Sequence, residues 1–302
     1  MPQLMPSALP SHHHAPAARA RFALFGALLL IVPSLVHAQT KNATLVGPVT
    51  HLEISALGDS ILVGSTAAVF LGSYFLQARK PAPAISGLSI SNVPAFDRLL
   101  YTTSYSSTLG YVSDGTVAAV TLLPLMLVPG ADRNDIIAGA VVYSESVGIS
   151  YVAKDLLKSL VVRYRPYAYS SSPPASLVST TGVENSFPSG HVTVAFAAAV
   201  TGGMLFDRFH TKPLDRALYW GTAMSLATGT AALRVASGNH FLSDVVAGAA
   251  LGSLVGFLVP YLHTVNPSST ASSGGASSLS FFPPAGGSPA DGVPIVRWSY
   301  QW

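Results

Sequence analysis

The most regular feature of the chain is a succession of apolar runs separated by short polar stretches. A first run occupies residues 22–36, and six more occupy 61–76, 116–128, 136–153, 192–206, 218–233 and 245–262. None of them alternates polar and apolar positions cleanly, so strands of a β-barrel are not expected. Small residues recur in the last run, as in Gly248, Gly252 and Gly256, and such residues let helices in lipid approach closely. The pattern predicts an all-α helical bundle of about six core helices.

Polar connections separate these predicted helices. The stretch 77–94 contains several prolines and 167–187 is rich in Ser and Pro, so both are expected to be loops. The charged stretch 130–135 predicts a tight turn, and therefore a hairpin of the two helices that it joins. Residues 268–294 are rich in Ser, Gly and Pro, a composition typical of a flexible segment.

Composition indicates that lipid surrounds this bundle. Charged residues make up only 10% of the 302 residues and hydrophobic residues 49%, whereas an average soluble domain carries about 25% charged residues. Several runs are shorter than the ~20 residues that a membrane span requires, so a soluble α-helical domain is the alternative. No Lys/Arg cluster of the kind that binds nucleic acid is present, and no nucleic-acid partner is expected. The absence of cysteine excludes disulfides and cysteine-ligated zinc.

The N-terminal run has the features of an export signal. Arg19 and Arg21 precede the apolar residues 22–36, and Val36-His37-Ala38 supplies a candidate cleavage site. An uncleaved membrane anchor is the alternative. The predicted organisation is a signal peptide (or anchor) at 1–38, a linker at 39–56, the helical domain at 57–263 and a flexible tail at 264–302.

Three short polar blocks beside the apolar runs carry the candidate chemistry. In the first, Lys158 and Arg165 are seven residues apart, so they face the same way if the segment is helical. Arg163 adds a third cation, and Pro166 ends the helix. Cations at the end of an apolar segment are costly unless they face water or an anion. An ordinary basic flank of a membrane helix is the alternative for this block.

The second block, Phe187-Pro-Ser-Gly-His191, leads directly into the run 192–206. Ser189 is placed to cap that helix. Free amides at a helix start bind phosphate, and Gly190 lets a ligand approach the backbone closely. Histidine transfers protons readily near neutral pH, and His191 lies at the same helix start. A plain helix cap beside a chance histidine is the alternative.

The third block extends from Arg234 to Asp244, between the last two apolar runs. His240 and Asp244 are four residues apart, so they are predicted to meet on one helix face. A carboxylate bonded to one imidazole nitrogen leaves the other nitrogen free to attack as a nucleophile. Arg234 adds another cation. A buried structural His–Asp pair is the alternative.

The three blocks come together if each intervening helix crosses the bundle once. One end of the bundle then holds three cations, helix-start amides, two histidines and an orienting carboxylate. This set predicts an anion site, at helix ends, with a nucleophile and a proton donor. It lacks the clustered carboxylates of a two-metal phosphatase, so no metal is expected there.

These blocks resemble the signature of the type 2 phosphatidic acid phosphatase superfamily, which includes bacterial class A acid phosphatases and vanadium haloperoxidases. The family pattern is Lys, six residues, Arg-Pro; then Pro-Ser-Gly-His; then Ser-Arg, five residues, His, three residues, Asp. The spacings here match in all three blocks. The resemblance covers residues 158–244, and the apolar context extends it to about 57–262. Leu233 stands where the family often has Ser, which puts a hydroxyl contribution at that place in doubt.

The resemblance implies a role for each matching residue. His240 attacks phosphorus and forms a phosphohistidine, Asp244 orients His240, and His191 protonates the leaving oxygen. The phosphate is held by Lys158, Arg165, Ser189, Gly190 and Arg234. Arg163 is not a signature position and is a candidate helper. The family's phosphatases require no cofactor, and vanadate is needed only if the chain is a haloperoxidase.

The expected function is hydrolysis of phosphate monoesters or diphosphates, with lipid phosphates as substrates. The alternatives are a soluble periplasmic acid phosphatase of broad specificity and a vanadate-dependent haloperoxidase. Three cations in 207–216 favour the cytoplasm for that loop, which puts the active site of an inner-membrane protein on the periplasmic side. Three spans at 61–76, 116–128 and 136–153 put Lys158 in the cytoplasm instead, whether the signal is cleaved or kept as an anchor. We therefore expect a segment that does not cross, or insertion of another region such as 99–112.

Overall fold

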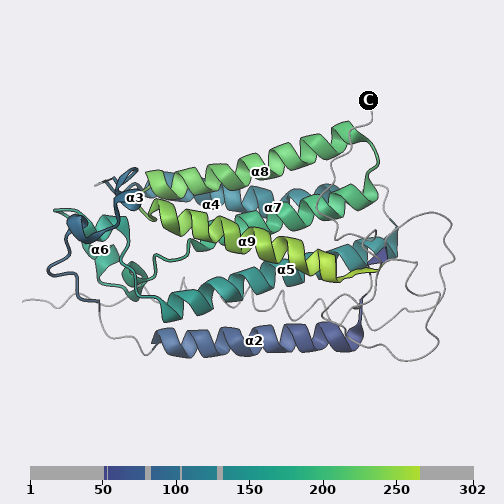
Figure 1. Cartoon of the computed structure of the whole chain (residues 1–302), viewed down its shortest axis with the longest axis horizontal. Coiled ribbons are helices and arrows are strands. Elements are labelled where there is room, and N and C mark those ends of the chain that lie inside the picture. Colours follow the sequence, from purple (N-terminus) through teal and green to yellow (C-terminus); the bar gives the residue numbers. More distant parts are fainter. Residues whose placement is uncertain (1–50, 53, 79–82, 103, 128–131, 266–302) are drawn as a thin grey trace, which may run out of the picture. The chain divides into compact units, whose positions relative to one another are not determined.

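The computed structural model describes residues 51–265 apart from 53, 79–82, 103 and 128–131, and this part is mainly helical (Figure 1). Its long helices are α2 (Ala56–Ala78), α4 (Ser107–Leu122), α5 (Arg133–Leu160), α7 (Gly190–Phe209), α8 (Pro213–Ala236) and α9 (Leu242–Leu262). Short helical turns between them are η1 (Ile90–Asn92), α3 (Ala95–Arg98), η2 (Leu123–Leu127), η3 (Pro166–Tyr169), α6 (Ala175–Val178) and η4 (Thr181–Glu184). Two-residue strands β1 (His51–Leu52) and β2 (Thr264–Val265) pair antiparallel. The predicted all-α bundle of about six core helices is confirmed.

Parts of the predicted organisation lie outside the described residues. These parts are the signal peptide or anchor at 1–38, most of the linker at 39–56 and nearly all of the tail at 264–302. The helical domain predicted at 57–263 coincides closely with the described region.

Each long helix extends beyond the apolar run that predicted it. In α5, the side chain of Asp132 accepts a hydrogen bond from the backbone of Arg133, and the helix continues past the apolar run through Lys158. α4 begins well before its predicted start, where Ser106 caps it, and passes into η2 near Pro124, which has no N–H for a helical bond. The polar residues that flank the apolar runs of α4 and α5 therefore belong to the helices.

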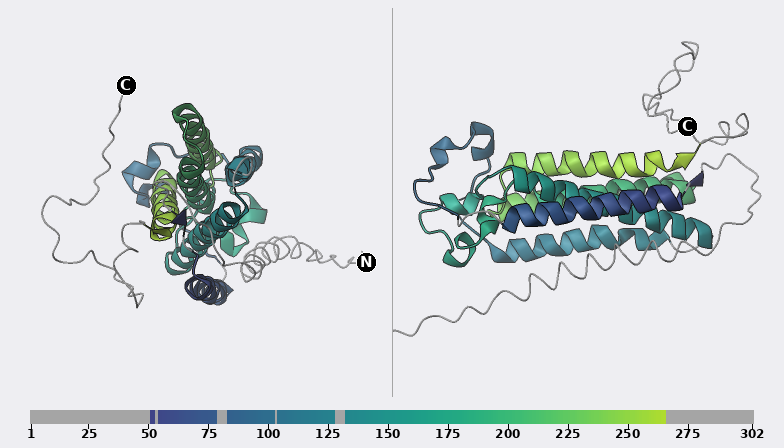
Figure 2. Two further views of the ribbon diagram at one scale, coloured as in Figure 1. Left: turned by 90° about the vertical axis from the view of Figure 1, so that its right-hand side faces the viewer. Right: turned by 90° about the horizontal axis from the view of Figure 1, so that it is seen from below.

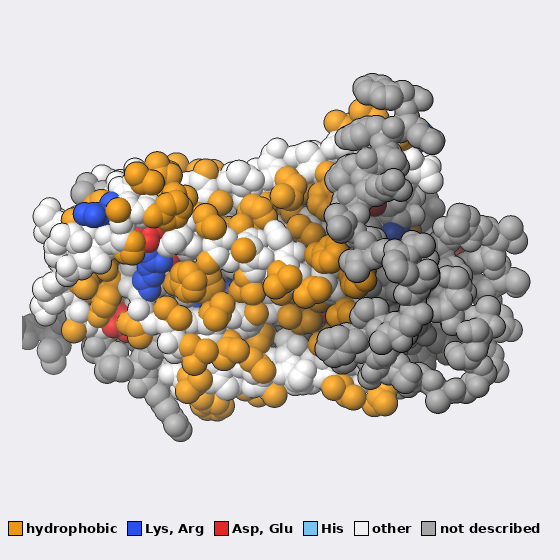
Figure 3. Space-filling view, viewed as in Figure 1, with side chains coloured by type: hydrophobic (Ala, Val, Ile, Leu, Met, Phe, Trp, Pro, Cys, Tyr) orange, Lys and Arg blue, Asp and Glu red, His pale blue; other side chains and the backbone are white. Residues whose placement is uncertain are grey.

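Within the described part of the chain, four helices are long and apolar enough to cross a membrane. They are α2, α5, α7 and α9, and they contain 20 to 28 residues each. Large apolar side chains on α2 and α9 face outward, among them Ile61, Phe75, Leu254 and Phe257. Figure 3 shows hydrophobic side chains spread along the helices of one face. Exposed apolar surface of this extent fits lipid better than water, in agreement with the predicted membrane-embedded bundle.

α7 lies at the centre of the bundle, with α4, α5, α8 and α9 packed around it (Figures 1 and 2). Its inner positions are small: Ala195 and Ala199 are fully buried against Val120 of α4 and Ala223 of α8. α2 lies at the edge and packs against α5 (Figure 2). Small side chains on the central helix let four neighbours approach it closely.

Gly248, Gly252 and Gly256 form a stripe on α9 that faces α7. A Cβ atom at Gly252 would lie 2.2 Å from the carbonyl oxygen of Thr193 and 3.0 Å from the amide nitrogen of Ala197. At Gly248 it would lie 2.7 Å from the carbonyl oxygen of Ser189. The close helix approach predicted from these small residues is confirmed, and it anchors the N-terminus of α7 against α9.

We expect Gly252→Ala to destabilise the bundle by about 1–3 kcal/mol, because the new methyl group must push α7 away from α9. Gly221→Ala in α8 is the matched control, since nothing lies within 4 Å of a Cβ atom at Gly221. Thermal unfolding in detergent measures both variants. Equal melting temperatures for the two would contradict the helix contact.

The long helices alternate in direction, so the bundle has two ends (Figure 1). We call the end where α5 and α8 finish and α4, α7 and α9 begin the motif end, and the opposite end, which holds β1 and β2, the distal end. α2, α4 and α5 all extend between the two ends. The stretch 99–112 holds the connection into α4 and its first turns. The expectation of a segment that does not cross, or of an extra insertion at 99–112, stays a prediction.

Candidate active site

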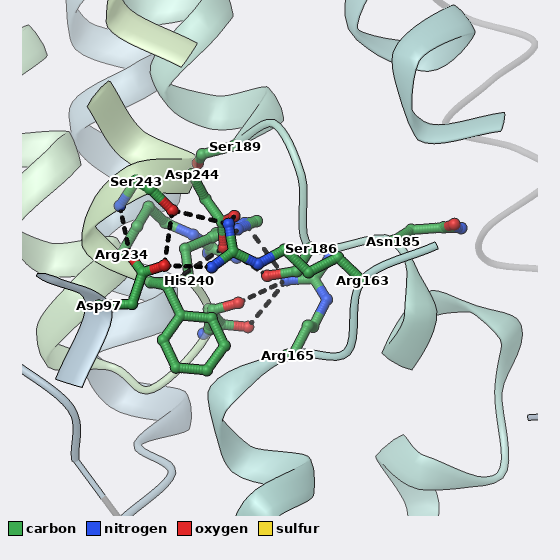
Figure 4. A network of polar contacts seen from close by, with 12 residues as sticks. Asp97, Arg163, Arg165, Asn185, Ser186, Ser189, Arg234, His240, Ser243 and Asp244 are labelled. Atoms are coloured by element: carbon green, nitrogen blue, oxygen red, sulfur yellow. Dashed lines mark hydrogen bonds and ion pairs between the residues drawn. The ribbon is translucent and has the colours of Figure 1, made fainter. Parts of the chain in front are cut away.

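The three sequence blocks meet at the motif end, as predicted (Figure 4). A tight turn after α8 makes this possible. Gly238 adopts a φ angle of +72°, and a Cβ atom there would lie 2.8 Å from the carbonyl oxygen of Ser104, so glycine is the residue that fits. The carbonyl oxygen of Gly238 accepts a hydrogen bond of 3.2 Å from the amide of Tyr167. This bond ties the turn that carries His240 to the turn that follows the first block.

His240 lies in the connection between α8 and α9 and is only 2% exposed. Its Nε2 atom is 3.3 Å from Nη1 of Arg165. Its Nδ1 atom is 3.6 Å from Oδ2 of Asp244 and has no hydrogen-bond partner among the described residues. The prediction that His240 and Asp244 share one helix face is wrong, because α9 begins only at Leu242. The two side chains approach each other across the N-terminus of α9 instead.

Asp244 is fully buried, and three groups hold its carboxylate. Arg163 donates to Oδ1 at 2.7 Å. The hydroxyl of Ser186 and the backbone N–H of Phe241 donate to Oδ2 at 2.5 Å and 2.9 Å. The bond from Phe241 also caps the start of α9. These bonds fix the carboxylate beside Nδ1 of His240.

Arg163, the candidate helper, links α3 to this carboxylate. Its guanidinium pairs with Asp97 of α3 as well as with Asp244 (Figure 4). Asp97 in turn accepts hydrogen bonds from the backbone and the hydroxyl of Ser243, at 2.8 Å and 2.9 Å. Arg163 therefore positions Asp244 and shares its charge between two carboxylates.

His191 is the more accessible of the two histidines. It lies in the first turn of α7, its side chain is 38% exposed, and its Nε2 atom is 2.8 Å from Oδ1 of Asp114 in α4. Arg234 lies 3.8 Å from the same carboxylate oxygen and donates to the hydroxyl of Ser113 at 3.3 Å. An accessible histidine with a carboxylate partner is suited to exchanging protons with solvent.

The predicted cations of the first block lie beside His240. Lys158 is buried and donates to the carbonyl oxygen of Asn185 at 2.5 Å. Arg165 is held by the carbonyl oxygens of Gly182 and Asn239, at 2.9 Å and 3.2 Å. Together with Arg234 they bring three positive charges to one buried imidazole, as the sequence predicted.

Ser189 and Gly190 occupy the start of α7 in a different way from that expected. Ser189 is the N-cap residue, but its side chain makes no capping bond, and its hydroxyl is buried without a partner among the described residues. A buried hydroxyl without a partner is costly, so this one suits a ligand oxygen. A Cβ atom at Gly190 would lie 2.8 Å from Cδ of Lys154. Here the glycine leaves room for a lysine side chain.

The surroundings of His240 favour the neutral imidazole. Burial lowers the pKa of His240 well below 6.5, and the charges of Arg165, Arg234 and Lys158 lower it further. A neutral imidazole retains the lone pair that a nucleophile needs.

Acid is therefore expected to destabilise the folded chain through His240. Because the folded-state pKa is depressed, the unfolded chain takes up a proton at this position first as the pH falls below about 6.5. The stability contributed by neutral His240 is full above that pH and declines below it. We expect the melting temperature of His240→Asn to fall less than that of the parent between about pH 7.5 and pH 5.5. Equal losses in thermal unfolding would contradict this.

The sequence analysis missed three residues of the site. Asp97 and Asp114 come from α3 and α4, outside the three blocks, and Ser186 directly precedes the second block. The only signal for Asp114 was a lone carboxylate in an apolar helix, which usually has a specific partner. Nothing in the local sequence pointed to its contact with His191.

The model of the PAP2 superfamily matches residues 139–267. The chain is 32% identical to a decaprenylphosphoryl-5-phosphoribose phosphatase of Mycobacterium tuberculosis. The 140 aligned residues cover 46% of this chain and 67% of that protein. The chain is 39% identical over 75 residues to a lipid A 1-phosphatase of Porphyromonas gingivalis, which covers 24% of this chain and 15% of that protein.

Among solved structures, the chain is similar to the crystal structure of a transmembrane PAP2 type phosphatidylglycerolphosphate phosphatase from Bacillus subtilis. That comparison has a TM-score of 0.37 at 16% identity and covers 80% of this chain and 94% of the other. The match to the PAP2 family model includes all three sequence blocks. With this match, and with a relative 32% identical that is covered over 67% of its length, the chain belongs to the PAP2 superfamily.

Proposed function

We propose that this chain is a membrane phosphatase that hydrolyses lipid phosphate monoesters or diphosphates through a phosphohistidine at His240. The observation that carries the proposal is the position of His240: a buried imidazole, whose pKa is lowered by burial and by nearby cations, lies among Lys158, Arg165 and Arg234, with Asp244 beside its Nδ1 atom. The cations attract a phosphate, and the imidazole supplies the nucleophile. The relatives named above are phosphatases, and their names specify lipid-linked phosphates.

The reaction has two steps in this proposal. In the first, Nε2 of His240 attacks phosphorus, the bond to the leaving oxygen breaks, and protonated His191 gives that oxygen a proton. In the second, neutral His191 takes a proton from water, the water oxygen bonds to phosphorus, and the P–N bond to His240 breaks. The charge that develops on the phosphate oxygens is stabilised by the basic side chains and by the Ser189 hydroxyl.

We assign no catalytic metal to this mechanism. The carboxylates near His240 and His191 are engaged by basic side chains: Arg163 pairs with Asp97 and Asp244, and His191 pairs with Asp114. Arginine and lysine therefore take the place that metal ions occupy in two-metal phosphatases.

Exposed apolar side chains beside the site favour lipid substrates. Phe96 in α3 and Leu99 and Leu100 just after it are 50–71% exposed, and Leu160 and Val162 are 66% and 61% exposed at the end of α5. An acyl or prenyl chain would cover these apolar side chains and remove them from water, whereas a small soluble phosphoester would not.

We place the motif end on the periplasmic side of a bacterial inner membrane. The connection between α7 and α8 lies at the distal end, and Arg208, Lys212 and Arg216 lie within or beside it. Arg133 begins α5 at the same end. Because connections rich in Lys and Arg stay in the cytoplasm, these cations support a cytoplasmic distal end.

A substrate panel tests the proposed function. Phosphate release from phosphatidate and a polyprenyl diphosphate is compared with release from small phosphoesters, in detergent and with a chelator present. We expect faster release from the lipid substrates, undiminished by the chelator. Release from the small esters alone would favour a broad-specificity acid phosphatase. Peroxide-dependent halide oxidation that requires vanadate, without phosphate release, would indicate a haloperoxidase.

A further inference from the structure

A second group of ionisable side chains lies away from the motif end. Asp59 comes from the first turn of α2, Glu145 from within α5, and His263 from the residue that follows α9. Nε2 of His263 is 3.4 Å from Oδ1 of Asp59 and 3.2 Å from Oε2 of Glu145. The proposed mechanism uses none of the three. Ionisable groups within a membrane bundle are costly, so such a cluster has a specific role more often than not.

The hydrogen bonds of His263 orient its ring toward the two carboxylates. Its Nδ1 atom is 2.7 Å from the carbonyl oxygen of Val259. Because a carbonyl oxygen only accepts, Nδ1 carries a hydrogen and donates it. This leaves Nε2 directed at Asp59 and Glu145. Metal-binding histidines are commonly held in this way, with one nitrogen bonded to a backbone carbonyl and the other on the ion.

Glu145 is the second observation that points to a ligand. It is 4% exposed, and neither of its carboxylate oxygens has a hydrogen-bond partner among the described residues, although Oε2 lies 3.2 Å from Nε2 of His263. Oδ2 of Asp59 also lacks one in that part of the chain. Even with His263 protonated, two carboxylates and one imidazolium carry a net negative charge. Buried charge of this kind calls for a further cation.

We propose that Asp59, Glu145 and His263 bind a divalent transition-metal ion of the Zn²⁺ class, which fastens α2 to α5 and to the end of α9. Zinc accepts imidazole and carboxylate ligands at about 2.0–2.2 Å in tetrahedral geometry, which separates neighbouring ligand atoms by about 3.3–3.6 Å. The distances of 3.2 Å and 3.4 Å from Nε2 of His263 are close to that separation. The candidate ligand atoms of the three residues lie within 4.8 Å of one another.

This metal stabilises the fold and takes no part in the chemistry at His240. Ser73 is the one buried side chain of α2, which packs along α5 at the edge of the bundle, so the ion adds a link from this outer helix to α5 and to the end of α9. A dipositive ion also balances two carboxylates and one neutral imidazole, so the cluster becomes electrically neutral. Phosphate release measured below the melting temperature is expected to be unchanged by removal of the ion.

Metal content and melting temperature test the proposal. The full chain, purified in detergent without a polyhistidine tag, is stripped with a chelator and dialysed against Zn²⁺. Bound zinc is measured by mass spectrometry in the parent, His263→Ala and Glu145→Gln. His210→Ala is the matched control, because Nδ1 of His210 also lies near a backbone carbonyl four residues earlier, yet no described carboxylate pairs with its ring. The run His12-His13-His14 is common to all four proteins.

We expect the parent and His210→Ala to retain one more zinc per chain than His263→Ala and Glu145→Gln. Zn²⁺ should raise the melting temperature of the first two by several degrees and leave that of the other two unchanged. The parent loaded with Co²⁺ should show the visible absorption of a low-coordinate site, which tests the proposal even if the variants fail to fold. Equal zinc content in all four proteins, or a parent without that absorption, would show that the cluster is an ion pair only.

Discussion

His240→Ala is expected to lower turnover by several orders of magnitude while the bundle stays folded. Removal of a nucleophile that acts together with a general acid abolishes the covalent route, and only the residual effect of the binding groups remains. The loss should appear in kcat, because the phosphate-binding residues Lys158, Arg165 and Arg234 stay in place. Phosphate release under saturating substrate measures it.

Two further variants show whether the loss is due to the missing nucleophile. His240→Asn leaves a smaller cavity than alanine at a residue that is 2% exposed, and it should be as inactive as His240→Ala. His210→Ala changes a histidine at the distal end and should retain full turnover. Melting temperatures close to that of the parent establish that the inactive variants are folded. Near-normal phosphate release by either His240 variant would rule out the proposed nucleophile.

His191→Gln is expected to lose about 10²–10⁴-fold in kcat on a lipid alkyl phosphate, the usual contribution of a positioned general acid. The loss should depend on the leaving group. An alkoxide must be protonated as it departs, whereas a nitrophenolate leaves readily without a proton. We therefore expect a much smaller loss on nitrophenyl phosphate. The measurement is the ratio of kcat values for the two substrates in parent and variant.

Asp114→Asn serves as the companion variant for His191. Its carboxylate lies 2.8 Å from Nε2 of His191, so it acts through that histidine. We expect a smaller loss than for His191→Gln, with the same dependence on the leaving group. An equal loss on both substrates in His191→Gln would instead mean that His191 binds phosphate.

The catalytic blocks could be predicted from the sequence because each lies within a few residues of a helix end. Apolar runs located the helices, and the alternation of helix starts and ends then brought Lys158, Ser189 and His240 to one place. The contacts made by α3 and α4 could not be predicted. Asp97 and Asp114 reach the site through tertiary packing, and local spacing contains no information about it.

Two details of the site differ from the predictions made from the sequence, each for a physical reason. His240 and Asp244 lie four residues apart, but the helix begins between them, so the spacing did not correspond to one helix face. Ser189 occupies the N-cap position, but its hydroxyl is turned away from the capping bond. Helix starts are the places where residue spacing predicts side-chain direction least well.

The structure also sharpens a conflict over membrane topology. His51 and Leu52 lie at the distal end, where β1 pairs with β2 beyond α9. If α2, α4 and α5 each cross the membrane, a periplasmic motif end requires these residues to be cytoplasmic. A cleaved signal peptide would leave them in the periplasm. On that condition the proposed periplasmic site and the predicted cleavage at Ala38 exclude each other. α4, with 16 residues, is not among the described helices that can cross a membrane by length and composition, and the positive charges at the distal end favour the periplasmic site.

The central claim is that His240 carries the phosphate during turnover, and trapping of the phosphorylated protein tests it most directly. The full chain is mixed with ³²P-labelled lipid phosphate, quenched in alkali, in which phosphohistidine survives, and digested to locate the label. We predict label on His240 in the parent and none in His240→Asn. On a substrate with a good leaving group, His191→Gln should carry more label than the parent, because hydrolysis of the intermediate is slowed. Label on another residue, or active His191→Gln that turns over without any trapped label, would contradict the account.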